Sequence, residues 1–244
     1  MKTATQPIVM HGTGRMAGAV VDELEKSKDF HIAATVGPDA PGWGLAAPHH
    51  FSLNELLALP VLVIDFSLPD GTRTAARWCA DKGVALLSGV TGLPADVSKA
   101  LEVASASVPV LWSPNLSLGI NLMAGLAKQA AAALGPETPV SIEDVHHQWK
   151  KDAPSGTALM LGEAISSRWH GEGNVAFSSV REGEEVGVHR ISFRLAGEEI
   201  ELVHHAHSRG IYALGALSAA NWLIRQQPGL YSAADWLAGR ISDA

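Results

Sequence analysis

The chain has only one cysteine, Cys79, among its 244 residues, and it lacks both long apolar runs and runs of basic residues. A single cysteine excludes an internal disulfide framework and fits a reducing compartment. No uncharged apolar stretch approaches the roughly 20 residues that span a bilayer, and the first apolar run, IVM, is too short for a signal peptide. Eighteen Lys and Arg against 25 Asp and Glu give a net charge of −7, which argues against nucleic acid. We therefore expect a cytoplasmic protein with neither a membrane nor a nucleic-acid partner.

A glycine-rich turn follows the first apolar segment. Residues 7–10 form a short apolar run typical of a strand, and after the turn a helical pattern continues to Leu24. Between them, Gly12, Gly14 and Ala17 satisfy the form G-x-G-x-x-(G/A), in the strand, turn and helix context of a dinucleotide-binding motif. The motif alone is weak, because an ordinary turn between a strand and a helix can have the same composition.

The second predicted strand, residues 31–36, ends without the acid that usually binds the ribose hydroxyls of NADH. Gly37 and Pro38 stand at this position, and Asp39 follows them. Neither Gly37 nor Pro38 can repel a 2′-phosphate, so NADPH is expected to be used at least as well as NADH. Arg15 is the nearby cation that could bind the phosphate.

Three further apolar runs, each followed by a polar or glycine-rich turn, continue the alternation of strands and helices. They span residues 61–66, 85–87 and 108–112, the turns read SLPDG, SGVTG and SPNLS, and helices are predicted at 52–59 and 72–82. Such alternation predicts a parallel sheet whose ligands bind at the carboxyl ends of the strands. The three turns are therefore expected to line one crevice.

The composition changes close to Ser117, which indicates a domain boundary. From here the predicted elements are a small-residue helix at 119–134, a strand at 140–145, a helix at 158–168, a hairpin of strands 190–195 and 199–204 turning at Gly197, and helices at 211–225 and 231–237. A sheet built mainly from neighbouring strands, with helices on one face, is an α+β domain.

The stretch from Asp144 to Ala158, DVHHQWKKDAPSGTA, places a proton site beside an anion site. His146, His147 and Lys150 supply titratable or cationic groups. The turn at residues 155–157 offers hydroxyls and backbone N–H groups to a carboxylate at the start of the next helix. A polar loop with a helix cap is the simpler alternative, but such a loop needs neither the paired histidines nor the lysine.

A second group of histidines, His204, His205 and His207, has the spacing of metal ligands. Alternation along a strand sends neighbouring side chains to opposite faces, and no Asp, Glu or Cys lies nearby to complete a shell. We therefore predict no metal site.

The run HHQWKKDAPSGTA resembles the signature of the dihydrodipicolinate reductase family, and the similarity extends along the chain from Gly12 to Arg225. It implies a Rossmann-like parallel-sheet domain made of residues 1–117 plus 208–244, and an α+β domain for substrate binding and oligomerisation made of residues 118–207. The segment from 168 to 181 is shorter than in many family members, which suggests a trimmed surface excursion. The chain departs from the family at His11, Ala17, Gly37 and Asp144.

The resemblance also implies roles for individual residues. His146 would be the proton donor, with Lys150 as its cationic partner. The substrate carboxylates would be held by His147, Ser155, Gly156 and Thr157. The cofactor would be bound by Gly12, Thr13, Gly14, Arg15, Met16, Phe66, Gly89, Val90, Thr91, Ser113, Pro114, Asn115 and Leu116.

The implied function is the reduction of 4-hydroxy-tetrahydrodipicolinate, a small dicarboxylate, by NADPH or NADH on the diaminopimelate route to lysine. A cytoplasmic homotetramer is implied as well. Two alternatives stay open at this point. One is a related two-domain oxidoreductase that acts on another amino or keto acid, and the other is a non-catalytic nucleotide-sensing protein, which would need no proton donor.

Overall fold

The computed structural model describes residues 5–44, 47–169 and 173–242. The chain folds into two compact units. Unit 1 contains the residues up to Ser117 together with those from Gly210 onward, and unit 2 is the continuous segment Leu118–Arg209. Unit 2 is therefore an insertion between two parts of unit 1.

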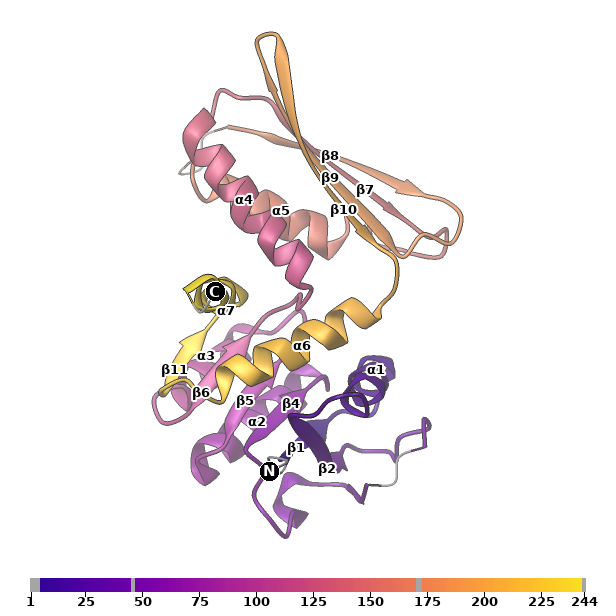
Figure 1. The fold of residues 1–244 in the computed structure, drawn as a ribbon, viewed down its shortest axis with the longest axis vertical. Coiled ribbons are helices and arrows are strands. Elements are labelled where there is room, and N and C mark those ends of the chain that lie inside the picture. Colours follow the sequence, from indigo (N-terminus) through magenta and orange to yellow (C-terminus); the bar gives the residue numbers. More distant parts are fainter. Residues whose placement is uncertain (1–4, 45–46, 170–172, 243–244) are drawn as a thin grey trace. The chain divides into compact units, whose positions relative to one another are not determined.

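Unit 1 is built on a sheet that has seven strands in the described part of the chain, ordered β11-β6-β5-β4-β1-β2-β3, and every pair is parallel (Figure 1). The strands are β1 (Gln6–His11), β2 (Phe30–Val36), β3 (His49–His50), β4 (Leu62–Asp65), β5 (Ala85–Ser88), β6 (Pro109–Trp112) and β11 (Gly229–Tyr231). The helices are α1 (Arg15–Leu24), α2 (Pro69–Lys82), α3 (Ala95–Ala104), α6 (Gly210–Leu223) and α7 (Ala233–Ser242). This arrangement confirms the predicted Rossmann-like parallel sheet.

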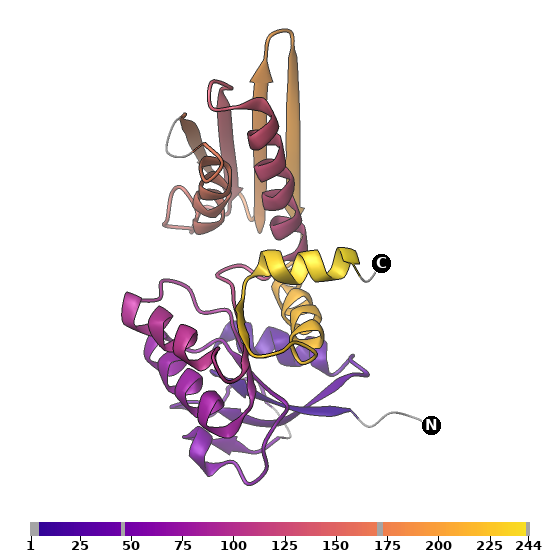
Figure 2. The ribbon, with the colours of Figure 1, turned by 90° about the vertical axis from the view of Figure 1, so that its left-hand side faces the viewer.

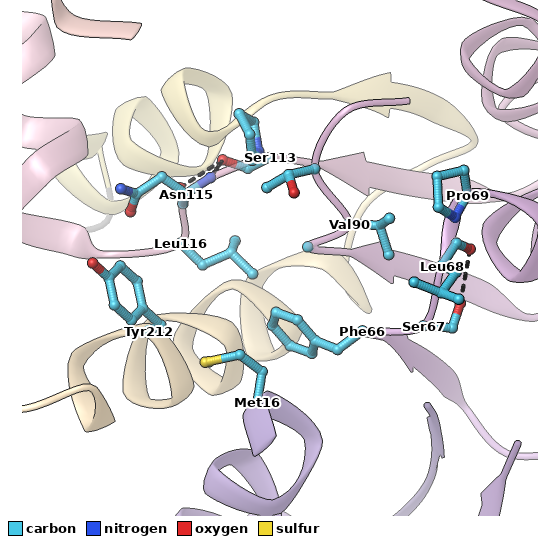
Figure 3. Close-up of a pocket in the computed structure, with 13 residues that line it drawn as sticks. Met16, Phe66, Ser67, Leu68, Pro69, Val90, Ser113, Asn115, Leu116 and Tyr212 are labelled. Carbon is cyan, nitrogen blue, oxygen red and sulfur yellow. Dashed lines mark hydrogen bonds between the residues drawn. The ribbon is translucent and has the colours of Figure 1, made fainter. Parts of the chain in front are cut away.

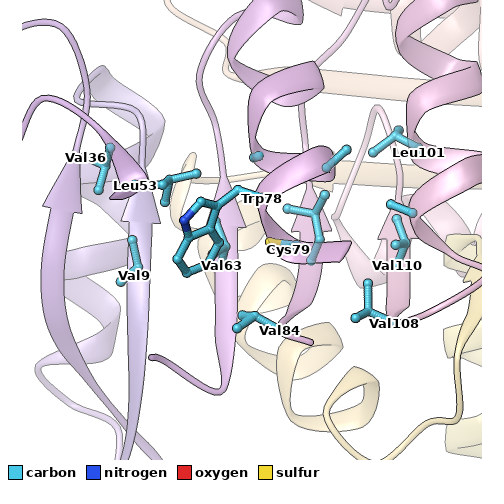
Figure 4. Close-up of a cluster of buried hydrophobic side chains, with 14 of the residues drawn as sticks. Val9, Val36, Leu53, Val63, Trp78, Cys79, Val84, Leu101, Val108 and Val110 are labelled. Carbon is cyan, nitrogen blue, oxygen red and sulfur yellow. The ribbon is translucent and has the colours of Figure 1, made fainter. Parts of the chain in front are cut away.

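The central strands are buried on both faces, as their continuous apolar runs predict. On one face, Val63 of β4 and Leu86 of β5 pack in a core with Trp78 and Cys79 of α2 and with side chains of α3 (Figure 4). The alternating residues of the same strands are equally buried and point to the opposite face, where α6 packs against β4, β5 and α1. Figure 2 shows α2 and α3 together on one side of unit 1.

Cys79 has no exposed surface, and burial raises the pKa of its thiol. It is the buried helix thiol that the pattern AARWCADKG predicts, and a thiol in this state is inert.

Two predicted helices of unit 1 were wrong in part. Residues 52–59 form only a short 3-10 turn, Leu53–Glu55, because one leucine of the segment, Leu53, is buried while Leu57 and Leu59 are exposed. The predicted helix 231–237 starts instead at Ala233, since residue 231 ends strand β11. Ser232 caps this helix by exchanging hydrogen bonds with Asp235.

Unit 2 is a four-stranded sheet, ordered β10-β9-β7-β8, with helices on one face (Figure 1). Its elements are α4 (Leu118–Leu134), β7 (Val140–His146), α5 (Gly156–Ser166), β8 (Val175–Arg181), β9 (Gly187–Leu195) and β10 (Glu198–Ala206). Strands β9 and β10 form the predicted hairpin, and Gly197 turns it with a φ of +88°. Alternate residues of β7 and β9 pack against α4 and α5, as an α+β domain requires.

Strand β8 is the element of unit 2 that the sequence did not predict. It pairs in parallel with β7 and makes the sheet mixed, whereas the sequence indicates only a shortened surface excursion at residues 168–181. Four of its seven residues are exposed, so it carries no run of buried residues to mark it as a strand. The chain passes from β7 to β8 through helix α5, because parallel strands cannot be joined by a tight turn.

None of the helices in the described residues is long and apolar enough to cross a membrane.

Candidate active site

The glycine-rich turn joins β1 to α1 at the carboxyl end of the unit 1 sheet. Gly12 has a φ of +107°, and a Cβ atom there would lie 2.6 Å from the carbonyl oxygen of Phe66. Gly14 precedes α1, and a Cβ atom on it would meet nothing within 4 Å. Gly12 is thus needed for the fold of the turn, whereas the bare Cα of Gly14 leaves open space above it. Ala17, where the family usually has glycine, is fully buried.

The first turn of α1 is open to an anion. Within the part of the chain that the structure describes, no side chain caps its N-terminus, and the turn contains no acidic residue. Uncapped N–H groups at a helix N-terminus, together with the helix dipole, attract phosphate. Arg15, the first residue of the helix, is exposed beside them.

A cavity of about 360 Å³ lies at the same end of the sheet (Figure 3). It is lined by Met16, Phe66, Ser67, Leu68, Pro69, Gly89, Val90, Thr91, Ser113, Pro114, Asn115, Leu116 and Tyr212. All the predicted cofactor residues from Met16 to Leu116 lie here, and the first four, from Gly12 to Arg15, form the neighbouring turn. The prediction did not include residues 67–69, although their turn was placed in the crevice, nor Tyr212. The tyrosine comes from α6 after the insertion of unit 2, so no local pattern pointed to it.

Asp65, at the end of β4, ties the walls of this cavity together. Its side chain is fully buried and accepts hydrogen bonds from Nδ1 of His11 (3.0 Å), from Ser67 Oγ (2.6 Å), from Thr72 Oγ1 (2.6 Å) and from Ser88 Oγ (2.9 Å). Burial alone would raise the pKa of this carboxyl group, but the bond and charge of His11 and the hydroxyl bonds outweigh it and hold the pKa below its usual value. The carboxylate therefore links the ends of β1, β4 and β5 to the first turn of α2.

In unit 2, alternation along β7 places Asp144 and His146 on the face of the sheet that α4 and α5 cover. Both side chains are buried, and His146 Nδ1 lies 3.0 Å from Asp144 Oδ2. Since an ionised carboxylate only accepts hydrogen bonds, Nδ1 carries a hydrogen and Nε2 is the nitrogen that exchanges protons. No hydrogen bond of the described residues occupies Nε2 of His146.

Asp144 remains ionised because β8 supplies partners for it. Burial alone would raise its pKa, but Ser179 Oγ donates to one oxygen and the guanidinium of Arg181 lies 2.9 Å from the other, so the pKa is lowered. The departure from the family at Asp144 thus still provides a carboxylate for His146. Sequence reasoning missed Ser179 and Arg181 because it missed β8.

The pKa of His146 is lowered, mainly by burial and by the nearby ammonium of Lys150, while Asp144 opposes both effects. A lowered pKa makes the imidazolium a stronger acid. Gly187 of β9 borders Nε2 of His146, since a Cβ atom there would lie 3.0 Å from that nitrogen. Gly187 was not predicted, and its bare Cα leaves the space that the His146 ring needs.

His189 of β9 packs edge-on against His146, with ring centroids 5.2 Å apart. It is almost fully buried, and its Nε2 lies 3.4 Å from Ser155 Oγ. Burial, followed by the charge of His146, lowers the pKa of His189 to about 4, so this imidazole is neutral near pH 7.

We expect the neutral His189 to make the protein less stable in acid. Between pH 6.5 and 4 the unfolded chain binds a proton at this histidine and the folded chain does not, so the stability that His189 contributes is lost as the pH falls through this window. Lowering the pH from 7.5 to 5 should cost about 2 kcal/mol through this residue. Urea unfolding of the wild type and of His189→Gln at both pH values measures it, and equal losses of stability in the two proteins would contradict the prediction.

The other predicted residues of unit 2 lie in and after the turn that follows β7. Lys150 Nζ binds both carboxylate oxygens of Asp152, at 2.9 and 2.8 Å, and His147 Nδ1 is buried without a hydrogen-bond partner among the described residues. Ser155 caps α5 by accepting from the backbone N–H of Ala158 (3.2 Å). Residues 156 and 157 form the first turn of that helix, where a Cβ atom on residue 156 would meet nothing within 4 Å.

Asp152 occupies the groups that a substrate carboxylate would use. Its pKa is lowered by the hydrogen bond from Lys150, and a backbone bond from Gly156 at the start of α5 contributes as well. The cation and the helix N-terminus therefore already act on one carboxylate. A ligand carboxylate at the anion site predicted from DAPSGT would therefore have to replace Asp152.

The second histidine group does not gather into a metal site. His204 and His205 follow one another along β10, and His204 pairs across the hairpin with His189. Within the described residues there is no group of three or more His, Cys, Asp or Glu side chains that could hold a metal ion.

Comparison with known proteins identifies the family. The model of the N-terminal domain of dihydrodipicolinate reductase matches residues 6–116, and the model of its C-terminal domain matches residues 119–237. The chain belongs to the dihydrodipicolinate reductase family. As a member it is an oxidoreductase that uses NAD(P)H, as predicted.

Individual relatives agree with this membership. The 4-hydroxy-tetrahydrodipicolinate reductase of Stenotrophomonas maltophilia is 40% identical over 235 residues, which cover 94% of this chain and 97% of the relative. The enzyme of the same name from Halorhodospira halophila is 36% identical, with 92% and 95% covered. A solved structure, the dipicolinate-bound dihydrodipicolinate reductase from Paenisporosarcina sp. TG-14, has the same fold with a TM-score of 0.82 at 20% identity, and 93% of this chain and 97% of that one are covered.

Proposed function

We propose that the chain reduces 4-hydroxy-tetrahydrodipicolinate to tetrahydrodipicolinate with NAD(P)H, on the diaminopimelate route to lysine. The observation that carries this proposal is the Asp144–His146 pair, which leaves Nε2 of His146 as a buried acid a few residues before a lysine and a helix N-terminus. Relatives at up to 40% identity carry the name of this reaction. Unit 1 would hold the cofactor and unit 2 the substrate.

The residues of unit 1 fit a nicotinamide dinucleotide. The open space above Gly14 and the uncapped first turn of α1 suit a pyrophosphate, and the cavity from Met16 to Tyr212 offers an apolar wall with a few polar groups for the nicotinamide end. The cofactor would supply the hydride for C4 of the substrate.

The chain's own residues would supply the proton. After loss of water and addition of hydride, the substrate is an enamine that must gain a proton at C3. Nε2 of His146 would donate it, while Asp144 holds the ring by Nδ1 and stabilises its protonated form. Lys150, His147 and the turn from Ser155 to Thr157 would bind the two carboxylates. Bound carboxylates also favour the imidazolium, which offsets the lowering of its pKa by burial.

The planar dicarboxylate pyridine-2,6-dicarboxylate tests this assignment. We expect it to bind unit 2 through the same cations and helix N-terminus, and a ligand at about 100 times its Kd raises the free energy of unfolding by about 2.7 kcal/mol. Thermal melting with and without millimolar analogue, in the presence of cofactor, measures the effect. A benzoate control carries one carboxylate and should shift the melting temperature less. An unchanged melting temperature would count against a dicarboxylate substrate.

We also propose that the chain assembles as a homotetramer through the face of the unit 2 sheet that α4 and α5 leave uncovered (Figure 1). Charged side chains pair across the strands of this face, with Arg190 3.0 Å from Glu201 and Arg194 3.0 Å from Glu199. Pairs of this kind present both signs of charge to a second copy of the same sheet. A cytoplasmic location is proposed as well, and the buried, unpaired Cys79 supports it.

A further inference from the structure

The side chain of Thr13 takes the place where an acid would stand at the end of β2. Gly37 directly follows β2, and its backbone N–H donates to the carbonyl of His50 (3.1 Å). A Cβ atom on Gly37 would lie 3.0 Å from Cγ2 and 3.4 Å from Oγ1 of Thr13. A contact of 3.0 Å is tighter than nine in ten real Cβ contacts. An aspartate or glutamate at position 37 would therefore require the Thr13 side chain to shift by a few tenths of an ångström.

Thr13 is fixed in this position by its neighbours. Its carbonyl accepts a hydrogen bond from the indole Nε1 of Trp43 (3.1 Å). The same indole packs against α1, because a Cβ atom on Gly18 would lie 3.0 Å from the ring. On the other side, Gly12 lies against the backbone of Phe66. The turn is thus held between the loop after β2 and the turn after β4, and the Thr13 side chain is directed at the tip of β2.

We infer that the Thr13 side chain binds the ribose 2′ position of the cofactor in place of an acid, and that it thereby admits both NADH and NADPH. This inference rests on the proposed function only in its use of a nicotinamide dinucleotide. In a Rossmann domain, the side chain at the end of β2 bonds the 2′-hydroxyl, and an acid there repels a 2′-phosphate. The Thr13 hydroxyl has no charge, and it donates as well as accepts. It can bond the 2′-hydroxyl of NADH or a phosphate oxygen of NADPH, so the site does not discriminate against NADPH.

The test compares cofactor binding in the absence of substrate. The Kd values of NADPH and NADH are measured by isothermal titration calorimetry for the wild type, Thr13→Val, Gly37→Asp and the double variant Thr13→Gly/Gly37→Asp. Thr13→Val keeps the shape and loses the hydroxyl, so both cofactors should bind about 2- to 12-fold more weakly. The double variant has both the acid and the space for it. Its Kd for NADPH divided by its Kd for NADH should therefore be at least about tenfold higher than in the wild type. Gly37→Asp alone should move the ratio less, because Thr13 still fills the site.

Asp39→Asn is the matched control for a carboxylate near the end of β2. Asp39 is exposed two residues beyond Gly37, and its replacement should leave both Kd values unchanged. If Asp39→Asn binds NADPH more tightly relative to NADH than the wild type does, Asp39 contacts the ribose, and the role of Thr13 is overturned. That role would equally be overturned if Thr13→Val binds both cofactors like the wild type, or if Gly37→Asp and the double variant have equal ratios. Failure of the wild type to bind either cofactor would instead refute the proposed function. Melting curves confirm that each variant is folded.

Discussion

His146→Gln is expected to lower turnover by about 10² to 10⁴, because a positioned general acid is worth that much in rate. Glutamine can still bond Asp144 but cannot deliver a proton from the position of Nε2. The measurement is kcat with saturating substrate, together with the Kd of the cofactor. The latter should stay near the wild-type value, because the residues proposed to bind the cofactor all belong to unit 1. His31→Gln is the control, since His31 is exposed on β2 and belongs neither to the Asp144 cluster nor to the uncovered face of the unit 2 sheet.

The companion variant Lys150→Ala should lose turnover by similar factors, with a rise in KM as well, because it removes the cation that is proposed to bind a substrate carboxylate. Lys151→Ala is its control, since Lys151 is the exposed neighbour and forms no ion pair within the described residues. Wild-type turnover in both His146→Gln and Lys150→Ala would remove these residues from the mechanism. A loss of kcat with intact cofactor binding would assign them to the chemistry of unit 2.

Gly12→Ala and Gly14→Ala should fail in different ways. Alanine at position 12 would need a φ of +107° and would bring its Cβ to 2.6 Å from the Phe66 oxygen, so it should cost at least about 1–3 kcal/mol of stability. Alanine at position 14 meets no protein atom, because the backbone there has a φ of −79° and nothing lies within 4 Å of the Cβ position. It should melt like the wild type but bind the cofactor at least about tenfold more weakly, since the methyl group would take the space proposed for the pyrophosphate.

Chemical denaturation and calorimetric titration of the two variants separate these effects. A Gly14→Ala protein that binds NADPH and NADH normally would show that the open space above this residue does not receive the pyrophosphate. A fully stable Gly12→Ala protein would mean that the turn can move away from Phe66.

The parallel sheet and its cavity could be predicted because their signals are local. Continuous apolar runs mark strands that are buried on both faces, and the turns after them must meet at one edge of a parallel sheet. From the sequence alone, this reasoning predicts that Phe66, Gly89 and Asn115 lie close together. The pair of Asp144 and His146 was not predicted, because the predicted strand ended at residue 145, although residues two apart on a strand share a face.

What could not be predicted depends on contacts distant in sequence. His11 and Asp65 are 54 residues apart, and nothing local in either segment indicates that they are bonded. Arg181 reaches Asp144 only because β8 pairs with β7, and β8 is too exposed for its pattern to reveal a strand. The helix expected at 52–59 failed for the related reason that helical spacing of leucines stabilises a helix only where the protein buries them.

The insertion of unit 2 within unit 1 sets an order for folding during synthesis. A ribosome that has released residues 118–209 has supplied everything that unit 2 needs, including both strands that surround His146. Unit 1 is still incomplete at that moment, because two of its elements, α6 and β11, come from the last 35 residues. Helix α6 packs against α1, and strand β11 pairs with β6. Domains tend to fold as units when their residues become available. The segment that carries His146, the proposed proton donor, is therefore assembled first, and the cavity proposed for the cofactor closes only when Tyr212 and the residues after it have emerged.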